Sequence, residues 1–201
     1  MTMHVKISKG NSKMGAIRSV SLPAIVTCRQ CGCHKKCYAK KIEQFRKTVA
    51  AAYKNNLQVL REMPDVYWQD VEAAVKKSNY FRFHVSGDIP NSDYFKQMVL
   101  LAHRNTHCEI LCFTKKFEIV NEYISEYGSL PSNLHIIFSG WVDLKMINPF
   151  SLPEAHVRYR DGFTTARDDA KECGGNCTEC AITHDGCWTL AHGEQVVFNE
   201  H

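Results

Sequence analysis

Ten cysteines in a chain of 201 residues constrain this protein more than any other feature of its sequence. Eight of them fall into two dense groups, one towards each end of the chain. Such a density indicates either a disulfide framework in an exported domain or metal ligation where thiols stay reduced. The N-terminus lacks the apolar run of a signal peptide, and no stretch approaches the roughly 20 apolar residues of a membrane span. We therefore expect a cytoplasmic protein with no membrane segment, whose cysteines bind metal.

The first cysteine group packs four thiols into ten residues, after a short apolar run at Ala24–Val26 that we expect to be a strand. Its members are Cys28, Cys31, Cys33 and Cys37. Thiolates are soft ligands that suit Zn²⁺ and iron–sulfur clusters, and the neighbouring lysines should lower their pKa values. A loop this tight could wrap several corners of a cuboidal cluster, while the N-terminus of the next helix offsets its negative charge.

The second group has spacings of three, two and six intervening residues. Its members are Cys173, Cys177, Cys180 and Cys187. Gly174, Gly175 and Gly186 should let the backbone approach the sulfurs and direct amide N–H groups at them, which tunes the potential of a cluster. His184 lies inside the last interval, and we expect it at the surface because four thiolates already complete a coordination set.

Zinc is the alternative metal. The pairs Cys28-x-x-Cys31 and Cys177-x-x-Cys180 could form two knuckles of one tetrahedral site, but about 150 residues separate them, against roughly 15 to 20 in compact zinc modules. Two separate sites of four cysteines would use all eight thiols and remain open as an alternative. We favour one or two iron–sulfur clusters, of the 4Fe-4S type.

Two further cysteines, Cys108 and Cys112, stand apart from both groups. They fall in or beside an apolar run, four positions apart, and so on the same face of a strand. Buried free cysteines are common in such places, so we expect both in the core.

Hydrophobic periodicity predicts an α/β fold in which strands and helices alternate. A helical pattern covers Tyr38–Met63, Pro64 should end it, and a second helix should cover Val66–Lys77. Strands are predicted at Tyr80–Val85, Glu109–Phe113, Leu134–Phe138, Val157–Tyr159 and Val196–Phe198, and helices near Ser92–His103 and Phe117–Tyr127 follow the first two. Such alternation implies parallel pairing through right-handed crossovers.

Five or six strands are fewer than the eight of a full barrel. We therefore expect an open or partial (β/α) barrel with mainly parallel strands and cysteine-rich loops, with a flat doubly wound sheet as the alternative. The prediction is a single domain over residues 1–201, with an extended arm at 1–20 and a cysteine-rich loop at 170–190. The carboxyl ends of parallel strands form the functional face, so residues there should surround a substrate. They are Asp88, Lys115, Lys116 and Trp141.

Charge is distributed unevenly along the chain. Residues 1–62 carry nine Lys and four Arg against two Glu, a net charge of +11, so the remainder carries −7 of the total of +4. A basic first third could bind nucleic acid, because clustered Lys and Arg release counterions from phosphates. A solvated helix face is the simpler interpretation, since the charges show no aromatic stacking pattern. A zinc-stabilised nucleic-acid-binding protein is therefore our alternative function.

Several short motifs resemble the phage and plasmid family called gene product eighty-eight. They are residues 7–15 (ISKGNSKMG), Ser21-Leu22-Pro23, Cys33 to Ala39, Val85-Ser86-Gly87-Asp88, Phe138-Ser139-Gly140-Trp141, Gly186-Cys187-Trp188 and Val197 to His201. The resemblance spans nearly the whole chain and implies expression in a bacterial cytoplasm from a phage or mobile element. It supplies no activity.

The ending Cys37-Tyr38-Ala39 is also similar to the cluster loops of radical S-adenosylmethionine enzymes. Those loops separate their three cysteines by three and two residues, whereas Cys28, Cys33 and Cys37 are separated by four and three. The likeness therefore implies geometry alone, a cluster at the mouth of a barrel. From the residues and these resemblances we expect an iron–sulfur protein, a redox or radical-type enzyme whose small-molecule substrate or redox partner the sequence does not identify.

Overall fold

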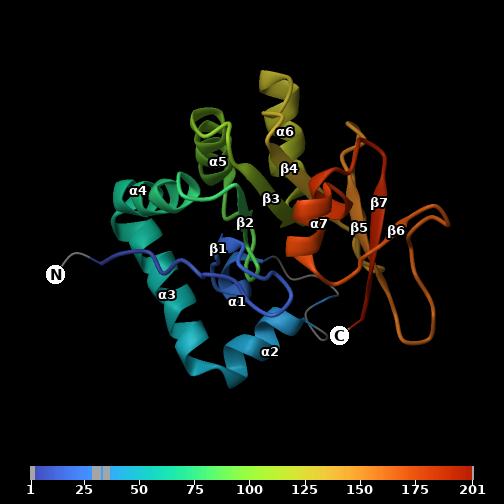
Figure 1. Cartoon of the computed structure of the whole chain (residues 1–201), viewed down its shortest axis with the longest axis horizontal. Helices are drawn as coiled ribbons and strands as arrows, with labels where there is room; N and C mark the ends of the chain where they lie inside the picture. The colour runs from blue at the N-terminus through green and yellow to red at the C-terminus, as the bar shows by residue number, and fades with distance from the viewer. Residues whose placement is uncertain (1–2, 29–32, 34–36, 201) are drawn as a thin grey trace.

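The computed structural model describes residues 3–28, 33 and 37–200, and its centre is one sheet of seven strands (Figure 1). The strands are β1 (Arg18–Val20), β2 (Tyr80–Phe83), β3 (Glu109–Thr114), β4 (Leu134–Ser139), β5 (Glu154–Arg158), β6 (Lys171–Glu172) and β7 (Gln195–Asn199). Their order across the sheet is β1-β2-β3-β4-β5-β7-β6, and every neighbouring pair is parallel. The sheet is open, with β1 and β6 at its two edges. The predicted α/β class with parallel strands is confirmed.

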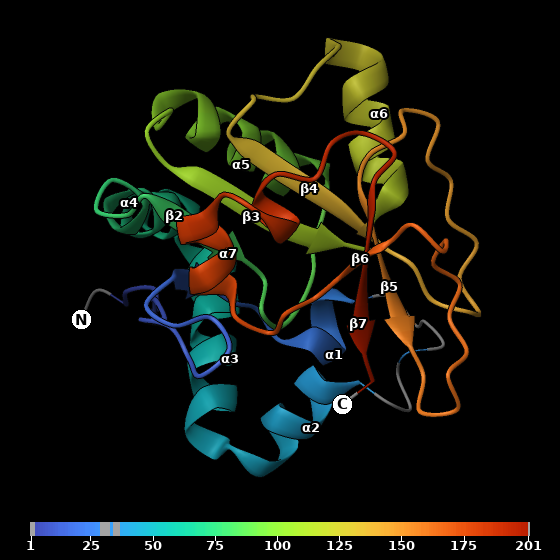
Figure 2. The same cartoon turned by 45° about the vertical axis from the view of Figure 1, so that its right-hand side comes forward.

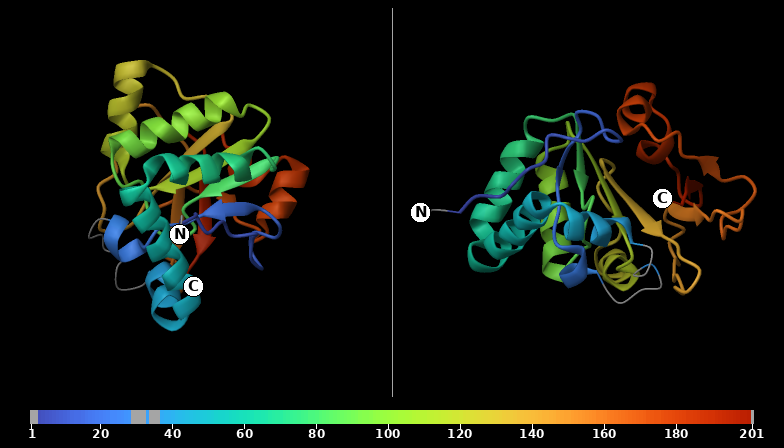
Figure 3. Two further views of the ribbon diagram at one scale, coloured as in Figure 1. Left: turned by 90° about the vertical axis from the view of Figure 1, so that its left-hand side faces the viewer. Right: turned by 90° about the horizontal axis from the view of Figure 1, so that it is seen from below.

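The longer helices cover one face of the sheet, and the segment between β6 and β7, which contains α7, covers the other face (Figures 2 and 3). The helices are α1 (Ala24–Thr27), α2 (Tyr38–Phe45), α3 (Lys47–Glu62), α4 (Pro64–Val75), α5 (Ser92–Arg104), α6 (Phe117–Tyr127) and α7 (Cys177–Thr183). A 3₁₀ turn, η2 (Gly186–Trp188), follows α7. The right-hand view of Figure 3 shows α7 across the sheet from α3, α4 and α5. The second cysteine group therefore lies on the face opposite to the helix layer.

Side chains of the strands alternate between two hydrophobic clusters, one on each face. Phe81 and Phe83 of β2 point into the larger cluster, together with buried residues of α4, α5 and α6. Leu111 and Ile137 point the other way and pack with Trp188 of η2 in the smaller cluster. We call this second side, which α7 and η2 cover, the inner face. Arg82 shares it, because it is paired with Leu111 between the two phenylalanines.

The first strand is not where the sequence analysis placed it. Ala24–Val26 was predicted as a strand, but the structure places it in α1, and β1 lies earlier within the predicted arm. Ile25 and Val26 are residues that favour strands, but this preference comes largely from packing on a sheet. Both side chains are exposed here, so they gain no such packing and the preference has little effect. The hydroxyl of Thr27 donates to the Pro23 carbonyl at 2.9 Å, which stabilises the short helical turn instead.

The single helix predicted over Tyr38–Met63 is two helices that meet at Arg46, whose φ of −111° and ψ of 85° are not helical. Glu43 explains the break, because its Oε1 accepts from the Ala24 N–H at 2.7 Å and from the Ser86 hydroxyl at 2.8 Å. These bonds hold α2 against the carboxyl edge of the sheet. α3 packs instead into the helix layer through Leu57, so the chain turns between the two.

Other boundaries follow the sequence closely. α3 ends at Glu62, and Pro64 occupies the first turn of α4, where its missing N–H costs no hydrogen bond. β5 begins three residues before the predicted Val157. The predicted count of five or six strands is low, because β6 has only two residues and no detectable pattern. Within the described residues, no helix combines the length and apolar character needed to cross a membrane.

Candidate metal centres

The first cysteine group lies at the carboxyl edge of the sheet. Cys28 directly follows α1, and its N–H donates to the Ala24 carbonyl at 3.0 Å. Cys37 is the N-cap residue of α2, and both thiols are half-buried. Cys33 is disulfide-bonded, so it would have to be reduced before it could bind metal, and Cys31 lies outside the described residues.

Three residues predicted to surround a substrate lie near Cys28. Burial, and after it the negative charge of Asp88, raise the pKa of the Cys28 thiol to about 12, while the ammonium groups of Lys115 and Lys116 act in the opposite direction. The nearby Cys37 thiol also raises the pKa of Cys28. The ends of β2 and β3 thus bring Asp88, Lys115 and Lys116 into electrostatic range of the first cysteine group.

Asp88 is a structural residue at this edge rather than a free carboxylate. Its oxygens accept hydrogen bonds from the Thr114 hydroxyl at 2.6 Å, the Lys115 N–H at 2.9 Å and the Ile89 N–H at 2.8 Å. Burial raises the pKa of the carboxyl group, and these bonds oppose that effect. Asp88 therefore fixes the β2 and β3 ends relative to each other and so positions the two lysines.

The fourth predicted residue, Trp141, belongs to a different cluster. It follows β4, and its ring meets the ring of Tyr159 edge-on, with 5.6 Å between centroids. Tyr159 in turn stacks on Phe163 at 5.9 Å. The structure therefore places Trp141 in an aromatic group beside β5, whereas the other three residues lie beside Cys28.

The second cysteine group gathers its four thiols against the inner face. Cys173 follows β6, Cys177 and Cys180 lie one turn apart on α7, and Cys187 lies in η2. All four pack against the apolar cluster of the inner face. Burial raises the pKa of Cys187 to about 12, with smaller contributions in the same direction from the other three cysteines of the group. The same mutual influence raises the pKa of Cys180, after burial.

Close backbone packing fixes this arrangement. Gly186 has φ +63°, and a Cβ built on it would lie 3.0 Å from the Cys180 sulfur, so a side chain would disturb the cysteines. The N–H of Cys177 donates to the Lys13 carbonyl at 2.9 Å, which ties α7 to the N-terminal segment. Tyr80 of β2 donates to the Ala181 carbonyl at 2.8 Å. The second group is thus anchored both to the sheet and to the beginning of the chain.

The donor chemistry fits soft metals, because each group offers thiols in a partly apolar environment. Within residues 3–28, 33 and 37–200, no three His, Cys, Asp or Glu side chains stand close enough to hold a metal ion as they are placed. His184 is exposed, as expected, and caps α7 in a left-handed conformation. Cys108 and Cys112 are buried in the core, also as expected.

Sequence reasoning missed two residues near these centres. Arg82 lowers the pKa of Cys187 and of Tyr38, so it lies on the side of β2 that faces both cysteine groups. His84 follows β2 in a left-handed conformation, φ 60°, and neither ring nitrogen has a hydrogen-bond partner in the described part of the chain. Strand alternation could have placed Arg82 opposite Phe81 and Phe83. Nothing in the sequence marks His84.

Comparison with known proteins gives one match. No curated protein and no solved structure matches the chain. The model of the family described as Gene product 88 matches residues 3–192, which include all eight cysteines of the two groups and the strand ends described above. The match covers almost the entire chain, and the protein therefore belongs to the Gene product 88 family.

Proposed function

We propose that this protein is an iron–sulfur protein with two centres, a redox or radical-type enzyme of the bacterial cytoplasm. Cys173, Cys177, Cys180 and Cys187 would hold one cluster of the 4Fe-4S type. Cys28, Cys33 and Cys37 would hold the other, with Cys31 as an optional ligand. Such clusters supply one-electron transfer when they are bound. The observation that carries the proposal is that all four half-buried thiols of the second group pack against one apolar cluster.

The grouping of the thiols supports two centres rather than one shared zinc site. Cys28 is influenced by Cys37, its neighbour in the first group. Cys187 is influenced by Cys173, Cys177 and Cys180, its neighbours in the second. A single tetrahedral ion made from half of each group would leave the other thiols of both groups without a role.

Raised thiol pKa values are compatible with metal binding, because a bound metal ion displaces the proton. Burial disfavours a lone thiolate at Cys28 or Cys187, so these side chains are protonated while no metal is present. Metal loading should therefore release protons, and acid should weaken it. The residues of the chain around the first centre would then act on a substrate, with Lys115 and Lys116 supplying positive charge.

Anaerobic purification followed by iron, sulfide and zinc analysis tests this proposal. We expect coloured protein with iron and acid-labile sulfide, and an absorption and electron paramagnetic resonance spectrum of cluster type. The double variant Cys177→Ser/Cys180→Ser should lose the iron of one centre, and Cys28→Ser/Cys37→Ser that of the other. Cys108→Ala is the matched control and should keep both. Colourless protein with stoichiometric zinc after failed cluster reconstitution would refute the proposal.

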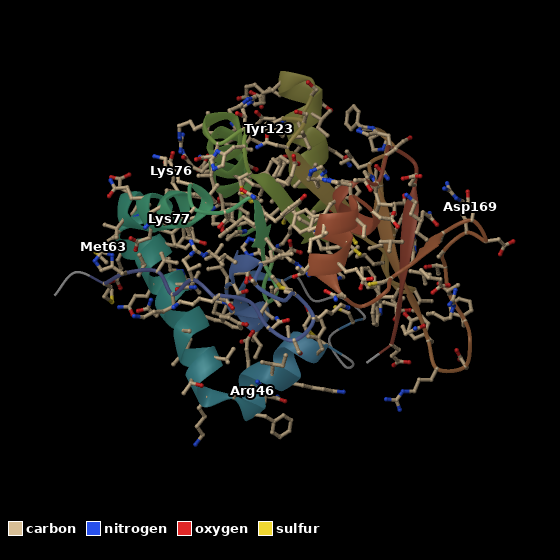
Figure 4. All side chains as sticks on the ribbon, in the orientation of Figure 1. Arg46, Met63, Lys76, Lys77, Tyr123 and Asp169 are labelled. Carbon is tan, nitrogen blue, oxygen red and sulfur yellow. The ribbon has the colours of Figure 1, made fainter. Side chains whose placement is uncertain are left out.

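A zinc-stabilised nucleic-acid-binding protein is the second candidate, and one surface favours it. The corner between α2 and α3 carries Lys41, Arg46 and Lys47 beside Phe45, which is 83% exposed. Figure 4 shows Arg46 at this corner, at the bottom of the view, and Asp169 at its right-hand edge. Phosphates and stacked bases would suit such a surface. Binding to single-stranded DNA or RNA should then weaken steeply with salt, and no detectable binding at low salt would exclude it.

A further inference from the structure

Arg82 is an unusual residue for the interior of a sheet. Its neighbours Phe81 and Phe83 are fully buried in the helix layer, so its own side chain lies on the inner face. The guanidinium carbon sits 4.8 Å from the centroid of the Phe113 ring. Its Nε atom is buried and has no hydrogen-bond partner among the residues that the structure describes. A buried donor of this kind normally has a partner, because an unmade bond costs free energy.

No described carboxylate forms an ion pair with this guanidinium. The side chains on which its charge acts are those of Cys187, Tyr38 and Cys112. Among the described residues, the Arg82 guanidinium is thus left without a carboxylate partner, which is costly for a partly buried cation.

A second cation reaches the same face. The ammonium group of Lys13 sits 5.0 Å from the centroid of the Phe198 ring, and this ring meets that of Phe113 edge-on at 5.8 Å. Lys13 also has no ion pair with a described carboxylate. Both cations are thus held over two rings that touch each other, and cation–π attraction fixes their positions. All four side chains are only partly buried, so solvent reaches this surface.

We propose that the inner face binds a small organic anion, whose carboxylate or phosphate group is held by Arg82 and whose charge is also balanced by Lys13. A guanidinium binds either group side-on through Nε–H and one terminal N–H. Because Nε is buried, this binding mode requires the covering side chains to move, and it would then satisfy the unpaired Nε. The exposed parts of Phe113 and Phe198 offer an apolar surface for the rest of the molecule. The inference goes beyond the proposed metal chemistry and does not require it.

Calorimetric titration with phenyl phosphate and with benzoate tests this site, because each probe joins one of the two anionic groups to an apolar ring. The wild type should bind at least one probe at low ionic strength, and the tighter one identifies the preferred group. Arg82→Gln should weaken binding roughly 10- to 100-fold, the size expected for lost charge-assisted hydrogen bonds. Lys13→Gln should weaken it by a smaller factor, about three- to tenfold.

Arg104→Gln is the matched control, because Arg104 is exposed on α5 and pairs with Glu72 in the helix layer. It should leave binding unchanged. Circular dichroism shows whether each variant folds. If Arg82→Gln does not fold, the effect of Lys13→Gln on binding still tests the site. Wild-type protein that binds neither probe would overturn the inference, as would equal binding by the wild type, Arg82→Gln and Lys13→Gln.

Metal analysis of the same samples separates this inference from the proposed function. Arg82 could instead serve as the counter-charge of thiolates at the second centre. In that case Arg82→Gln would lose iron and the wild type would bind neither probe, which overturns the anion site but leaves the metal proposal intact. Conversely, metal-free protein that binds a probe through Arg82 supports the anion site even if the metal proposal fails.

Discussion

His84 should make the stability of the protein depend on pH in a way that one substitution removes. The imidazole ring is buried beside Tyr94, with 5.5 Å between ring centroids, and its nitrogens have no hydrogen-bond partner in the described part of the chain. Burial lowers the pKa of His84 from 6.5 to about 3. The folded protein therefore keeps this ring neutral at pH values where the unfolded chain protonates it.

The direction and size of the effect follow from proton linkage. Between pH 6.5 and about 3 the unfolded state binds the extra proton, so the free energy of unfolding falls as the pH falls. Each pH unit well inside this window is worth about 1.4 kcal/mol. Between pH 7.5 and pH 5.0 the contribution of His84 sums to about 2 kcal/mol, because titration of the unfolded state begins only near pH 6.5. All other titrating groups add their own terms.

The change His84→Asn isolates this contribution. Asn does not titrate and tolerates a positive φ, so the backbone at this position can be kept. Urea unfolding at pH 7.5 and pH 5.0 should show that the wild type loses about 2 kcal/mol more than the variant over this interval. His184→Asn is the matched control, since His184 has a similar φ of 51° but an exposed side chain, and it should behave as the wild type. Equal losses in His84→Asn and the wild type would refute the reasoning.

Three further predictions follow from single contacts. Asp88→Asn should lower the free energy of unfolding by about 1–3 kcal/mol in urea titrations, because Asn has one acceptor oxygen where Asp88 uses two, so its NH₂ group would face a donor such as the Lys115 N–H; an unchanged midpoint would contradict it. Gly140→Ala should cost a similar amount by thermal unfolding, since the new Cβ would lie 2.6 Å from the His156 ring nitrogen; a stable variant would show that the ring can move. Cys108, whose pKa burial raises to about 12, should resist iodoacetamide at pH 7.5 by mass spectrometry and react only in urea.

Much of the fold could be predicted because the alternation of strands and helices is strong in the middle of the chain. β2, β3 and β4 begin at their predicted residues and end within two residues of their predicted ends, and α5 and α6 follow β2 and β3 as expected. The failures lie where tertiary contacts outweigh local preference. Arg46 interrupts a helical period because Glu43 binds the sheet edge, and α1 replaces a strand because its apolar side chains face solvent.

The candidate site could be predicted only in part, for a similar reason. Cysteine spacing marks the second group because its members are close in sequence. Asp88 and Lys116 are found by the rule that strand ends converge. The same rule does not predict the contact of Trp141 with Tyr159, because it does not say which neighbours a side chain at a strand end meets. The unpaired charge of Arg82 depends on which groups fail to reach it, and absences of this kind leave no pattern in a sequence.

The direction of the last crossover determines how the two cysteine groups relate to each other. Helices α5 and α6 both belong to the helix layer on one face of the sheet. If the last crossover also ran over that face, the inner face would be exposed to solvent. Between β6 and β7 the chain passes over the other face, and this carries Cys177 and Cys180 onto the side where Arg82 projects. The first group stays at the carboxyl edge, at the end of β1. Arg82 acts electrostatically on Cys187 of the second group and on Tyr38, which follows Cys37 of the first group in the chain. A ligand held by Arg82 on the inner face would therefore lie between the two cysteine groups.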